Sequence, residues 1–269
     1  MTGIPVWWDG ESDGSTNMAA DECLAAEAVA RGGLVVRVYG WSSTTISLGA
    51  FQSIADARRC GAIAGLPIVR RPSGGGAIVH GTDITYAAAV PKGHPWGAVP
   101  QVLYDAFHGA MAGVLRERGV DASLFASKDR PSALDSPSTD GEPFLCFDRR
   151  SPGDLVLEHP ALSGAHEPKI MGSAQRRLAA AVLQHGSLLV RRNLDVGSSG
   201  RHPGLAECVG GDWSHDAGAR GLVEEWLHRV AAALGQPLSR QDGPFCAGAW
   251  PGLNAARERF ASDRWTSRR

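Results

Sequence analysis

A run of three consecutive glycines, Gly74, Gly75 and Gly76, most constrains what this chain can fold into. The run stands in RRPSGGGAIVH, from Arg70 to His80. Glycine costs chain entropy on folding and contributes no side chain to a core, so burial does not explain three in a row. The run permits positive φ angles and lets a ligand lie directly against backbone N–H groups, which can form a concave anion site.

The residues around the glycines leave two interpretations open. Arg70 and Arg71 supply fixed positive charge for a phosphate or a carboxylate. The segment is not a P-loop, because no Gly-Lys-Ser/Thr follows, and it is not a dinucleotide fingerprint, because a strand rather than a helix follows. The glycines alone favour a second interpretation equally well, which is a glycine-rich hairpin turn with two solvated arginines. His80 by itself is more often a structural histidine than a catalytic one.

Hydrophobic periodicity predicts an irregular mixture of helices and strands. We expect helices over 16–31, with Asn17 as the N-cap, over 100–118, within 222–234 and over 253–260. The valine-rich run at 34–39 predicts a strand, and we expect further strands at 44–49 and on both sides of the glycines. Short β-like runs predict strands in FLCF, DLVL, PKIMGSAQRR and AVLQHGSLLV. The elements do not alternate as βαβ units, so we expect an α+β fold with mixed, mostly antiparallel β-sheets flanked by helices.

The length of 269 residues suits one large domain or two modest ones. Neither an internal repeat nor a clear linker interrupts the chain, and we expect a single domain over residues 1–269. The stretch 127–142 is rich in Ser, Pro and Asp and predicts a long surface loop, and EHPALSGAHE at 158–167 predicts an extended hairpin loop.

Composition excludes several classes of function. Lys and Arg number 27 and Asp and Glu number 28, a balance that argues against nucleic-acid binding. The N-terminus lacks a signal-peptide pattern and no window reaches the roughly 20 apolar residues of a membrane span, so we expect a cytoplasmic protein without a membrane partner. The five cysteines form no CxxC pair, so we expect neither a disulfide framework nor a metal site.

One cysteine and one lysine are candidates for chemistry. Cys146 stands between Phe144 and Phe147, where most cysteines are small buried hydrophobic residues. Lys169 opens KIMGSAQ, a run of apolar and small residues in which an unpartnered ammonium is costly to bury. An ammonium close to a thiol favours the thiolate, which is the nucleophilic form. The local sequence favours a structural Cys146, and the functional interpretation requires the fold to bring Lys169 to it.

Taken together, several segments resemble the lipoate and biotin protein ligase and transferase superfamily. NMAADE is similar to its N-terminal helix, VVRVYGWSSTTISLGAFQ to a strand pair, RRPSGGGAIVHGTDITYA to its substrate loop and CFDRRSPGDLVL to its cysteine segment. KIMGSAQRR and LQHGSLL are similar to its lysine strand and the following hairpin. The resemblance runs from about Asn17 to Leu189 and is strongest to the cysteine-dependent octanoyltransferases of the LipM and LipL type. It implies a fold like the catalytic domain of class II biotin and lipoate protein ligases.

The resemblance also implies a role for each matching residue. Cys146 would hold an acyl group as a thioester, and Lys169 would contact the acyl carbonyl or carboxylate. His185 alone remains compatible with an ordinary turn histidine. The implied substrate-binding residues are Arg71, Ser73, Gly74, Gly75, Gly76, Ala77, Ile78, Val79, His80, Gly172, Ser173, Ala174, His185 and Gly186.

The implied reaction moves an octanoyl or lipoyl group onto a specific lysine of a lipoyl domain or glycine-cleavage H protein. The donor would be acyl carrier protein or an octanoylated carrier domain, and no cofactor would be required. An ATP-dependent lipoate-protein ligase is the first alternative; it would use the same pocket for lipoyl-AMP and would need ATP and Mg. The glycine triplet is closer to those ligases, whereas HGTDITYA is closer to the transferases. A non-catalytic relative that binds acylated carrier proteins is the second alternative.

Overall fold

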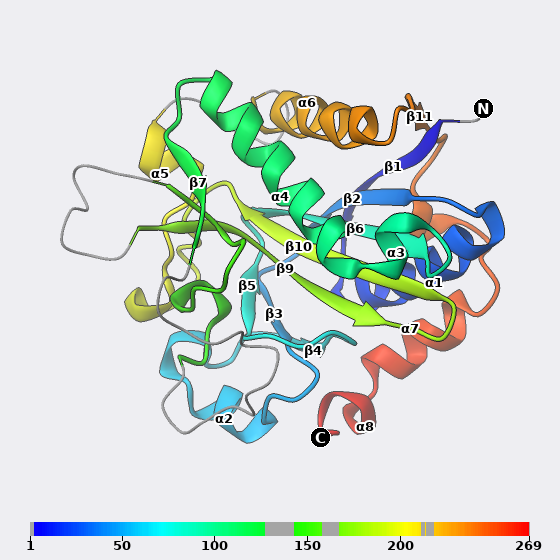
Figure 1. The fold of residues 1–269 in the computed structure, drawn as a ribbon. Helices are drawn as coiled ribbons and strands as arrows, with labels where there is room; N and C mark the ends of the chain where they lie inside the picture. The colour runs from blue at the N-terminus through cyan, green and yellow to red at the C-terminus, as the bar shows by residue number, and fades with distance from the viewer. Residues whose placement is uncertain (1–2, 127–142, 158–166, 211–212, 214–217, 269) are drawn as a thin grey trace.

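The computed structural model describes residues 3–126, 143–157, 167–210, 213 and 218–268, and Figure 1 shows its helices and strands. The strands are β1 (Ile4–Ser12), β2 (Val35–Trp41), β3 (Thr45–Leu48), β4 (Ile68–Arg70), β5 (Ile78–His80), β6 (Asp83–Pro91), β7 (Ala122–Leu124), β8 (Leu155–Leu157), β9 (Lys169–Arg177), β10 (Ala181–Leu189) and β11 (Leu238–Arg240). The helices are α1 (Gly14–Arg31), α2 (Ile54–Arg59), α3 (Pro95–Ala98), α4 (Pro100–Glu117), α5 (Leu205–Val209), α6 (Gly218–Ala233), α7 (Leu253–Ala261) and α8 (Asp263–Thr266). Short 3₁₀ turns are η1 (Gly61–Ile63), η2 (Cys146–Asp148), η4 (Ser198–Gly200) and η5 (Phe245–Ala247).

The strands form two sheets. The large sheet has eight strands in the order β11-β1-β2-β6-β10-β9-β8-β7, and the small sheet has the order β4-β3-β5. In the large sheet β11, β1 and β2 pair in parallel, and every pair from β2 through to β7 is antiparallel. The expected α+β class with mixed, mostly antiparallel sheets flanked by helices is therefore confirmed.

The alternation of side chains along β6 explains how helices cover both faces of the large sheet. One face of the strand packs into the core that includes α4 and α6, and the other into the core that includes α1 and α7. Because successive strand residues point to opposite faces, this apolar strand serves both cores. Ile84, Tyr86, Ala88 and Val90 lie on the first face, and Ala87 and Ala89 lie on the second.

The expected helices and most expected strands are present within a few residues of their predicted ends, but two local predictions are wrong. Asn17 does not cap α1, because Asp13 does so by accepting the N–H of Thr16 at 3.0 Å. The FLCF segment is not a strand; Cys146 begins the turn η2 and a single bridge joins Ala77 to Leu145. The apolar character of FLCF reflects packing against β5 and the residue before it, since Leu145 clusters with Ala77 and Phe147 with Ile78.

The glycine segment is a crossover rather than a hairpin. β4 pairs with β3 in parallel and β5 pairs with β3 antiparallel, so residues 71–77 pass from one edge of β3 to the other. Arg70 and Arg71 are 0% and 2% exposed, and hence are not solvated. The hairpin interpretation is wrong, and both arginines are built into the interior.

The expected loops at 127–142 and 158–167 fall on residues outside the described ranges, apart from Glu167. Over the residues that the structure does describe, every helix is too short or too polar to cross a membrane.

A buried arginine ties α1 to the large sheet. Arg37 on β2 is 0% exposed and donates to Asp9 Oδ2 at 2.6 Å and to Asp21 Oδ1 at 2.9 Å. The third guanidinium nitrogen of Arg37 donates to Asn17 Oδ1 at 2.7 Å. The side chain of Asn17 therefore binds the arginine instead of capping α1. Burial by itself lowers the pKa of Arg37, but the carboxylates of Asp21 and Asp9 raise that pKa above its ordinary value.

We predict that Arg37→Met lowers the free energy of unfolding by about 3–5 kcal/mol, because it leaves two buried carboxylates without their cation. Arg59→Met is the matched control, because Arg59 pairs with Asp56 at an exposed site and should cost less than about 1 kcal/mol. Urea unfolding at neutral pH measures both. Equal midpoints for the two variants would contradict the central role of Arg37.

Candidate active site

A cavity of about 430 Å³ lies between the large sheet and the small sheet. Its walls come from α1, β2, β3, the glycine crossover, β5, β6, η2, β9 and β10. The lining residues are Met18, Tyr39, Trp41, Ser47, Arg71, Gly75, Ile78, His80, Thr85, Cys146, Gly172, Ser173, Ala174, His185 and Gly186.

Most of the residues expected at a substrate site line this cavity, but several do not. Ser73, Gly74 and Gly76 belong to the glycine crossover but are not among the residues that line the cavity. Ala77 and Val79 face a separate hollow, because alternate residues of β5 point to opposite sides. Sequence reasoning did not single out five of the lining residues: Met18, Tyr39, Trp41, Ser47 and Thr85.

Cys146 and Lys169 meet at one end of the cavity. Lys169 Nζ lies 3.6 Å from Cys146 Sγ and 3.4 Å from the carbonyl oxygen of Cys146. The same nitrogen lies 2.8 Å from Asp154 Oδ2, in an ion pair whose side chains are each 3% exposed. A group that develops negative charge beside Cys146 is therefore within reach of a fixed ammonium.

Asp154 is the residue that makes a buried lysine tolerable here, and sequence reasoning missed it. Its Oδ2 accepts the N–H of Ser151 at 2.7 Å, and its Oδ1 accepts the hydroxyl of Tyr104 at 3.1 Å. Burial by itself lowers the pKa of Lys169, but Cys146 and Asp154 raise that pKa above its ordinary value. Lys169 thus stays an ammonium at neutral pH. The available signal was an acid at the start of DLVL, directly before an apolar run.

Two glycines make room for this arrangement. A Cβ on Gly76 would lie 2.9 Å from both the N and Cα atoms of Cys146, so only glycine lets the turn η2 dock on the crossover. The docking is held by two backbone bonds, Cys146 N to Ala77 O at 2.7 Å and Ala77 N to Phe144 O at 3.0 Å. A Cβ on Gly172 would lie 2.5 Å from Cε of Lys169. The glycines thus make space for the protein's own groups as well as for a ligand.

A directed chain of hydrogen bonds runs along one wall from β10 to α4. His108 Nδ1 donates to Gly153 O at 2.7 Å, so its Nε2 accepts the hydroxyl of Ser173 at 2.7 Å. Ser173 accepts from Tyr86 at 2.7 Å, and Tyr86 accepts from Gln184 at 2.6 Å. Burial lowers the pKa of His108 to about 4, which keeps the ring neutral and each bond in its direction.

His185 is held from both sides. Its Nδ1 lies 3.2 Å from Asp21 Oδ2, and its Nε2 bonds the hydroxyl of Ser73 in the glycine crossover. Asp21 also accepts from Tyr39 at 2.8 Å and from Arg37. His185 therefore connects the cavity wall to the buried arginine cluster under α1, and it is not an ordinary turn histidine.

His80 is held in the same way on the opposite wall. Its Nδ1 lies 2.8 Å from Asp83 Oδ2, and its Nε2 lies 2.8 Å from Ser47 Oγ. The ring of Trp41 stacks on the imidazole with centroids 3.9 Å apart and an interplanar angle of 13°. Asp83 stands three residues after His80 in HGTD, and that spacing was the sequence signal for the pair.

Arg71 is the cation of the glycine crossover. Its two terminal nitrogens donate to backbone oxygens of Ser47, Gly74 and Gly76, at 2.7, 2.8 and 2.6 Å. Its Nε is buried and has no hydrogen-bond partner among the described residues. Burial lowers the pKa of Arg71 to about 10, so the guanidinium remains charged at neutral pH. A carbonyl, carboxylate or phosphate oxygen in the cavity would meet that free donor.

No group of three or more histidine, cysteine, aspartate or glutamate side chains within the described ranges has the arrangement of a metal site.

This fold, with a glycine crossover and a cysteine–lysine pair beside one cavity, is that of the lipoyl protein ligase class of catalytic domains. The chain belongs to the lipoyl protein ligase A/B catalytic domain family, whose model matches residues 13–201. The match covers the glycine crossover, the cysteine turn and the lysine strand.

Curated relatives agree with this family. The chain is 34% identical over 187 residues to the octanoyltransferase LipM of Anoxybacillus flavithermus, covering 67% of this chain and 63% of that protein. It is 36% identical over 194 residues to the octanoyltransferase LipM of Symbiobacterium thermophilum, covering 70% of this chain and 64% of that protein. The matched region thus spans just under two thirds of the length of these relatives.

Solved structures agree with the fold. A bi-partite lipoate protein ligase from Thermoplasma acidophilum superposes with a TM-score of 0.64 at 16% identity, over 99% of this chain and 96% of that chain. A lipoate-protein ligase A bound with ATP superposes with a TM-score of 0.65 at 17% identity, over 99% of each chain. At these identities the likeness establishes the fold alone.

We predict that His108 makes the protein sensitive to acid. The unfolded chain binds a proton on this histidine below about pH 6.5, whereas the folded protein binds it only below about pH 4. The stability due to the neutral ring is therefore complete above about pH 6.5 and is lost as the pH falls toward 4, by an amount on the order of 3 kcal/mol. His108→Gln should flatten the change in unfolding free energy between these pH values. An unchanged pH dependence in urea titrations would contradict the assignment.

We predict that Gly172→Ala slows alkylation of Cys146 several-fold, because the added methyl group displaces the Lys169 side chain from the sulfur. Gly109→Ala is the matched control, since a Cβ at Gly109 meets nothing within 4 Å. Iodoacetamide labelling at neutral pH, followed by peptide mass spectrometry, measures both rates. Equal rates in the two variants would show that Lys169 does not act on Cys146.

Proposed function

We propose that the protein is an acyltransferase that carries an octanoyl or lipoyl group on Cys146. The observation that supports this best is the fixed Lys169 ammonium 3.6 Å from Cys146 Sγ at the end of a cavity. Its curated relatives carry the name octanoyltransferase. The same short distance counts against a non-catalytic relative, in which a buried cysteine far from the lysine would be expected.

In the first half-reaction the thiolate of Cys146 attacks the thioester carbonyl of an acylated carrier. The carrier thiolate leaves and takes up a proton, and the acyl group is then held as a thioester on Cys146. Lys169 donates a hydrogen bond to the oxyanion that develops on the carbonyl, and its ion pair with Asp154 keeps it in place. The donor is acyl carrier protein or an octanoylated carrier domain.

In the second half-reaction the amine of a lysine on a lipoyl domain or glycine-cleavage H protein attacks the Cys146 thioester. An amide forms, the C–S bond breaks, and the sulfur of Cys146 is released. An amide is more stable than a thioester, so neither step requires ATP or a metal.

The cavity fits an acyl chain with one polar end. Met18, Trp41 and Ile78 give it apolar walls for the alkyl part. The buried Nε of Arg71 and the ammonium of Lys169 supply donors for the carbonyl. Because Cys146 and Arg71 line the cavity and Lys169 Nζ lies 3.6 Å from the sulfur, the site suits an acyl group that enters the cavity with its carbonyl at the sulfur.

Residues 1–269 act as one catalytic domain in this proposal. The segment after the matched family region packs on the N-terminal part, since Arg259 of α7 pairs with Glu22 of α1 at 2.6 Å. Trp265 Nε1 also donates to Arg70 O at 2.9 Å. The C-terminal helices thus support the crossover that carries Arg71. We also propose that the protein acts in the cytoplasm.

An ATP-dependent lipoate-protein ligase is the second candidate. The free Nε of Arg71 beside the glycine triplet suits a carboxylate or a phosphate as well as a carbonyl. Such an enzyme would use free lipoate with ATP and Mg, and Cys146 would be dispensable. Release of pyrophosphate that depends on free lipoate would establish this candidate, and its absence supports the transferase.

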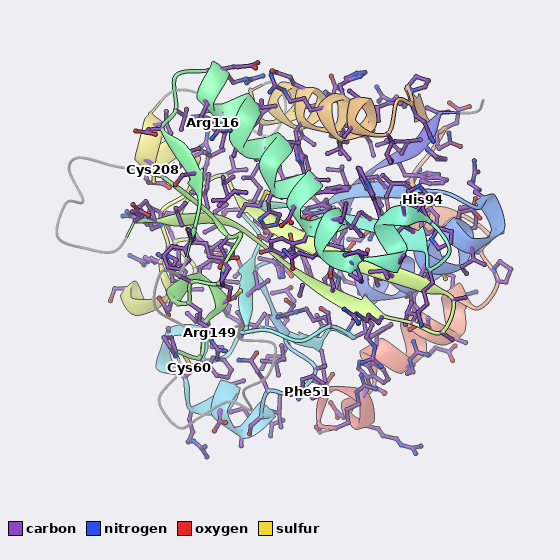
Figure 2. The ribbon with its side chains drawn as sticks, viewed as in Figure 1. Phe51, Cys60, His94, Arg116, Arg149 and Cys208 are labelled. Atoms are coloured by element: carbon purple, nitrogen blue, oxygen red, sulfur yellow. The ribbon has the colours of Figure 1, made fainter. Side chains whose placement is uncertain are left out.

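We predict that incubation with octanoyl-carrier protein adds one octanoyl group to Cys146, seen by peptide mass spectrometry. Cys146→Ala should abolish the adduct and slow transfer to a lipoyl domain by about 10³-fold or more, because the nucleophile is lost. Cys60→Ala is the matched control, since Cys60 lies next to α2 in Figure 2 and outside the cavity lining. Full transfer by Cys146→Ala would refute the proposed function.

A further inference from the structure

The transfer half-reaction poses a problem that Lys169 does not solve. A free acceptor lysine is an ammonium at neutral pH, because its pKa is about 10.4, and an ammonium cannot attack a thioester. A base must therefore take up a proton inside the cavity. Lys169 is already protonated and is held so by Asp154 at 2.8 Å. Among the described lining residues, the groups suited to this task are the two histidines, His80 and His185.

The surroundings of His80 set the direction of its hydrogen bonds. Asp83 accepts from the hydroxyls of Thr85 and Ser187, at 2.8 and 2.6 Å, and from the N–H of Gly81 at 3.0 Å. Burial raises the pKa of Asp83, but His80 and these donors bring that pKa below its ordinary value. Asp83 is therefore a carboxylate, and Nδ1 of His80 is the protonated nitrogen that donates to it.

The remaining nitrogen of His80 reaches the cavity through a serine. With the neutral ring, Nε2 accepts the hydroxyl proton of Ser47 at 2.8 Å. Arg71 donates to Ser47 Oγ at 3.2 Å, which turns the serine proton away from the arginine and toward the histidine. Ser47 lines the cavity, so its oxygen can accept from a group bound there. Serine, histidine and aspartate thus form a continuous path for one proton.

His80 is better suited than His185 to hold a second proton. The carboxylate beside His185 is Asp21, which also accepts from Arg37 and Tyr39. The serine on His185 Nε2 is Ser73, which is not among the residues that line the cavity. The ion-pair partner that the structure gives Asp83 is His80 itself. An imidazolium at His80 would therefore compensate the buried charge of Asp83 and reach the cavity through Ser47, whereas the serine bonded to His185 lies outside the cavity lining.

The other groups around His80 are consistent with a ring that changes its charge. The charged groups that face it are Asp83 from β6 and, through Ser47, Arg71 from the crossover. Trp41 of β2 covers one face of the ring at 3.9 Å, a position from which an indole stabilises a cation. Trp41 also donates to Thr85, which donates to Asp83, so the indole and the carboxylate are held by one set of bonds.

We propose that Ser47, His80 and Asp83 form the proton relay that deprotonates the acceptor lysine. Ser47 Oγ takes a proton from the acceptor ammonium as it passes its own proton to His80 Nε2, and Asp83 stabilises the imidazolium. The neutral amine then attacks the Cys146 thioester, the C–S bond breaks as the amide forms, and the released thiolate takes the second proton that the nitrogen loses. Solvent takes the first proton from the relay. The inference deepens the proposed function and rests on it.

The experiment separates the two half-reactions in wild type, His80→Gln, Asp83→Asn and Ser47→Ala. Acylation of Cys146 is measured first, by mass spectrometry with octanoyl-carrier protein. The isolated acyl-enzyme is then mixed with a lipoyl domain or with hydroxylamine, over a range from about pH 7 to about pH 10. Hydroxylamine is uncharged over this range and needs no base, so it reports on the thioester alone. His94→Gln is the matched control, because His94 lies on the loop before α3, away from the cavity lining (Figure 2).

The relay predicts normal acylation and normal release by hydroxylamine in all variants. Transfer to the lipoyl domain at about pH 7 should fall by about 10²-fold or more in His80→Gln and Asp83→Asn. Transfer should recover toward wild type near pH 10, where the acceptor lysine loses its proton to solvent. His94→Gln should behave as wild type throughout.

Two outcomes would overturn the relay. One is unchanged transfer at about pH 7 in His80→Gln and Asp83→Asn. The other is a parallel loss of acylation, hydroxylamine release and transfer at every pH, which would give these residues only a structural role. A wild-type enzyme that forms no thioester on Cys146 would instead refute the proposed function, and is recognised at the first step.

Discussion

The buried ion pair between Lys169 and Asp154 sets the geometry around the cysteine. An ammonium that is 4% exposed would be costly without a carboxylate 2.8 Å away, and this pair is further held by Ser151 and Tyr104. The cation next to Cys146 therefore has little freedom to turn toward water. A charge that is already in place when an oxyanion forms requires no reorganisation at that moment, which is the general advantage of a preorganised site.

The site depends equally on space left by missing side chains. Gly76 allows the cysteine turn to dock on the crossover, and Gly172 leaves the volume that the end of Lys169 occupies. A side chain at Gly76 would displace Cys146, and one at Gly172 would displace Lys169. Neither glycine need touch a substrate for this to hold. Glycines at a binding site thus serve two purposes, which are access for a ligand and close approach of the protein to itself.

Three histidines around one cavity differ because their partners differ. His108 donates to a backbone carbonyl and stays neutral, with its pKa lowered by burial to about 4. His185 faces Asp21, a carboxylate that also binds Arg37 and Tyr39, whereas His80 faces Asp83, for which it is the counter-charge. His108 is therefore a fixed hydrogen-bond acceptor, His185 is a connection to the Arg37 cluster, and His80 is a group able to gain a proton.

Much of the fold follows from local sequence. Apolar residues at helical spacing predicted α4 and α6, a valine-rich run predicted β2, and short β-like runs predicted β9 and β10, because these patterns record which faces of an element are buried. The errors occurred where a side chain serves the tertiary structure instead of its own element. Asn17 reads as a cap but binds Arg37, and FLCF reads as a strand but docks as a turn on β5.

The sequence by itself determined the residue types: three glycines in a row, one cysteine between aromatic residues, and one lysine in an apolar run. It also determined the order of elements and the family resemblance. Only the tertiary structure decided which groups meet. Asp154 beside Lys169, Asp21 beside His185, and Ser47 beside His80 on the cavity wall come from segments far apart in the chain. Such pairings depend on how the two sheets pack, because buried charges and donors find partners through space rather than along the chain.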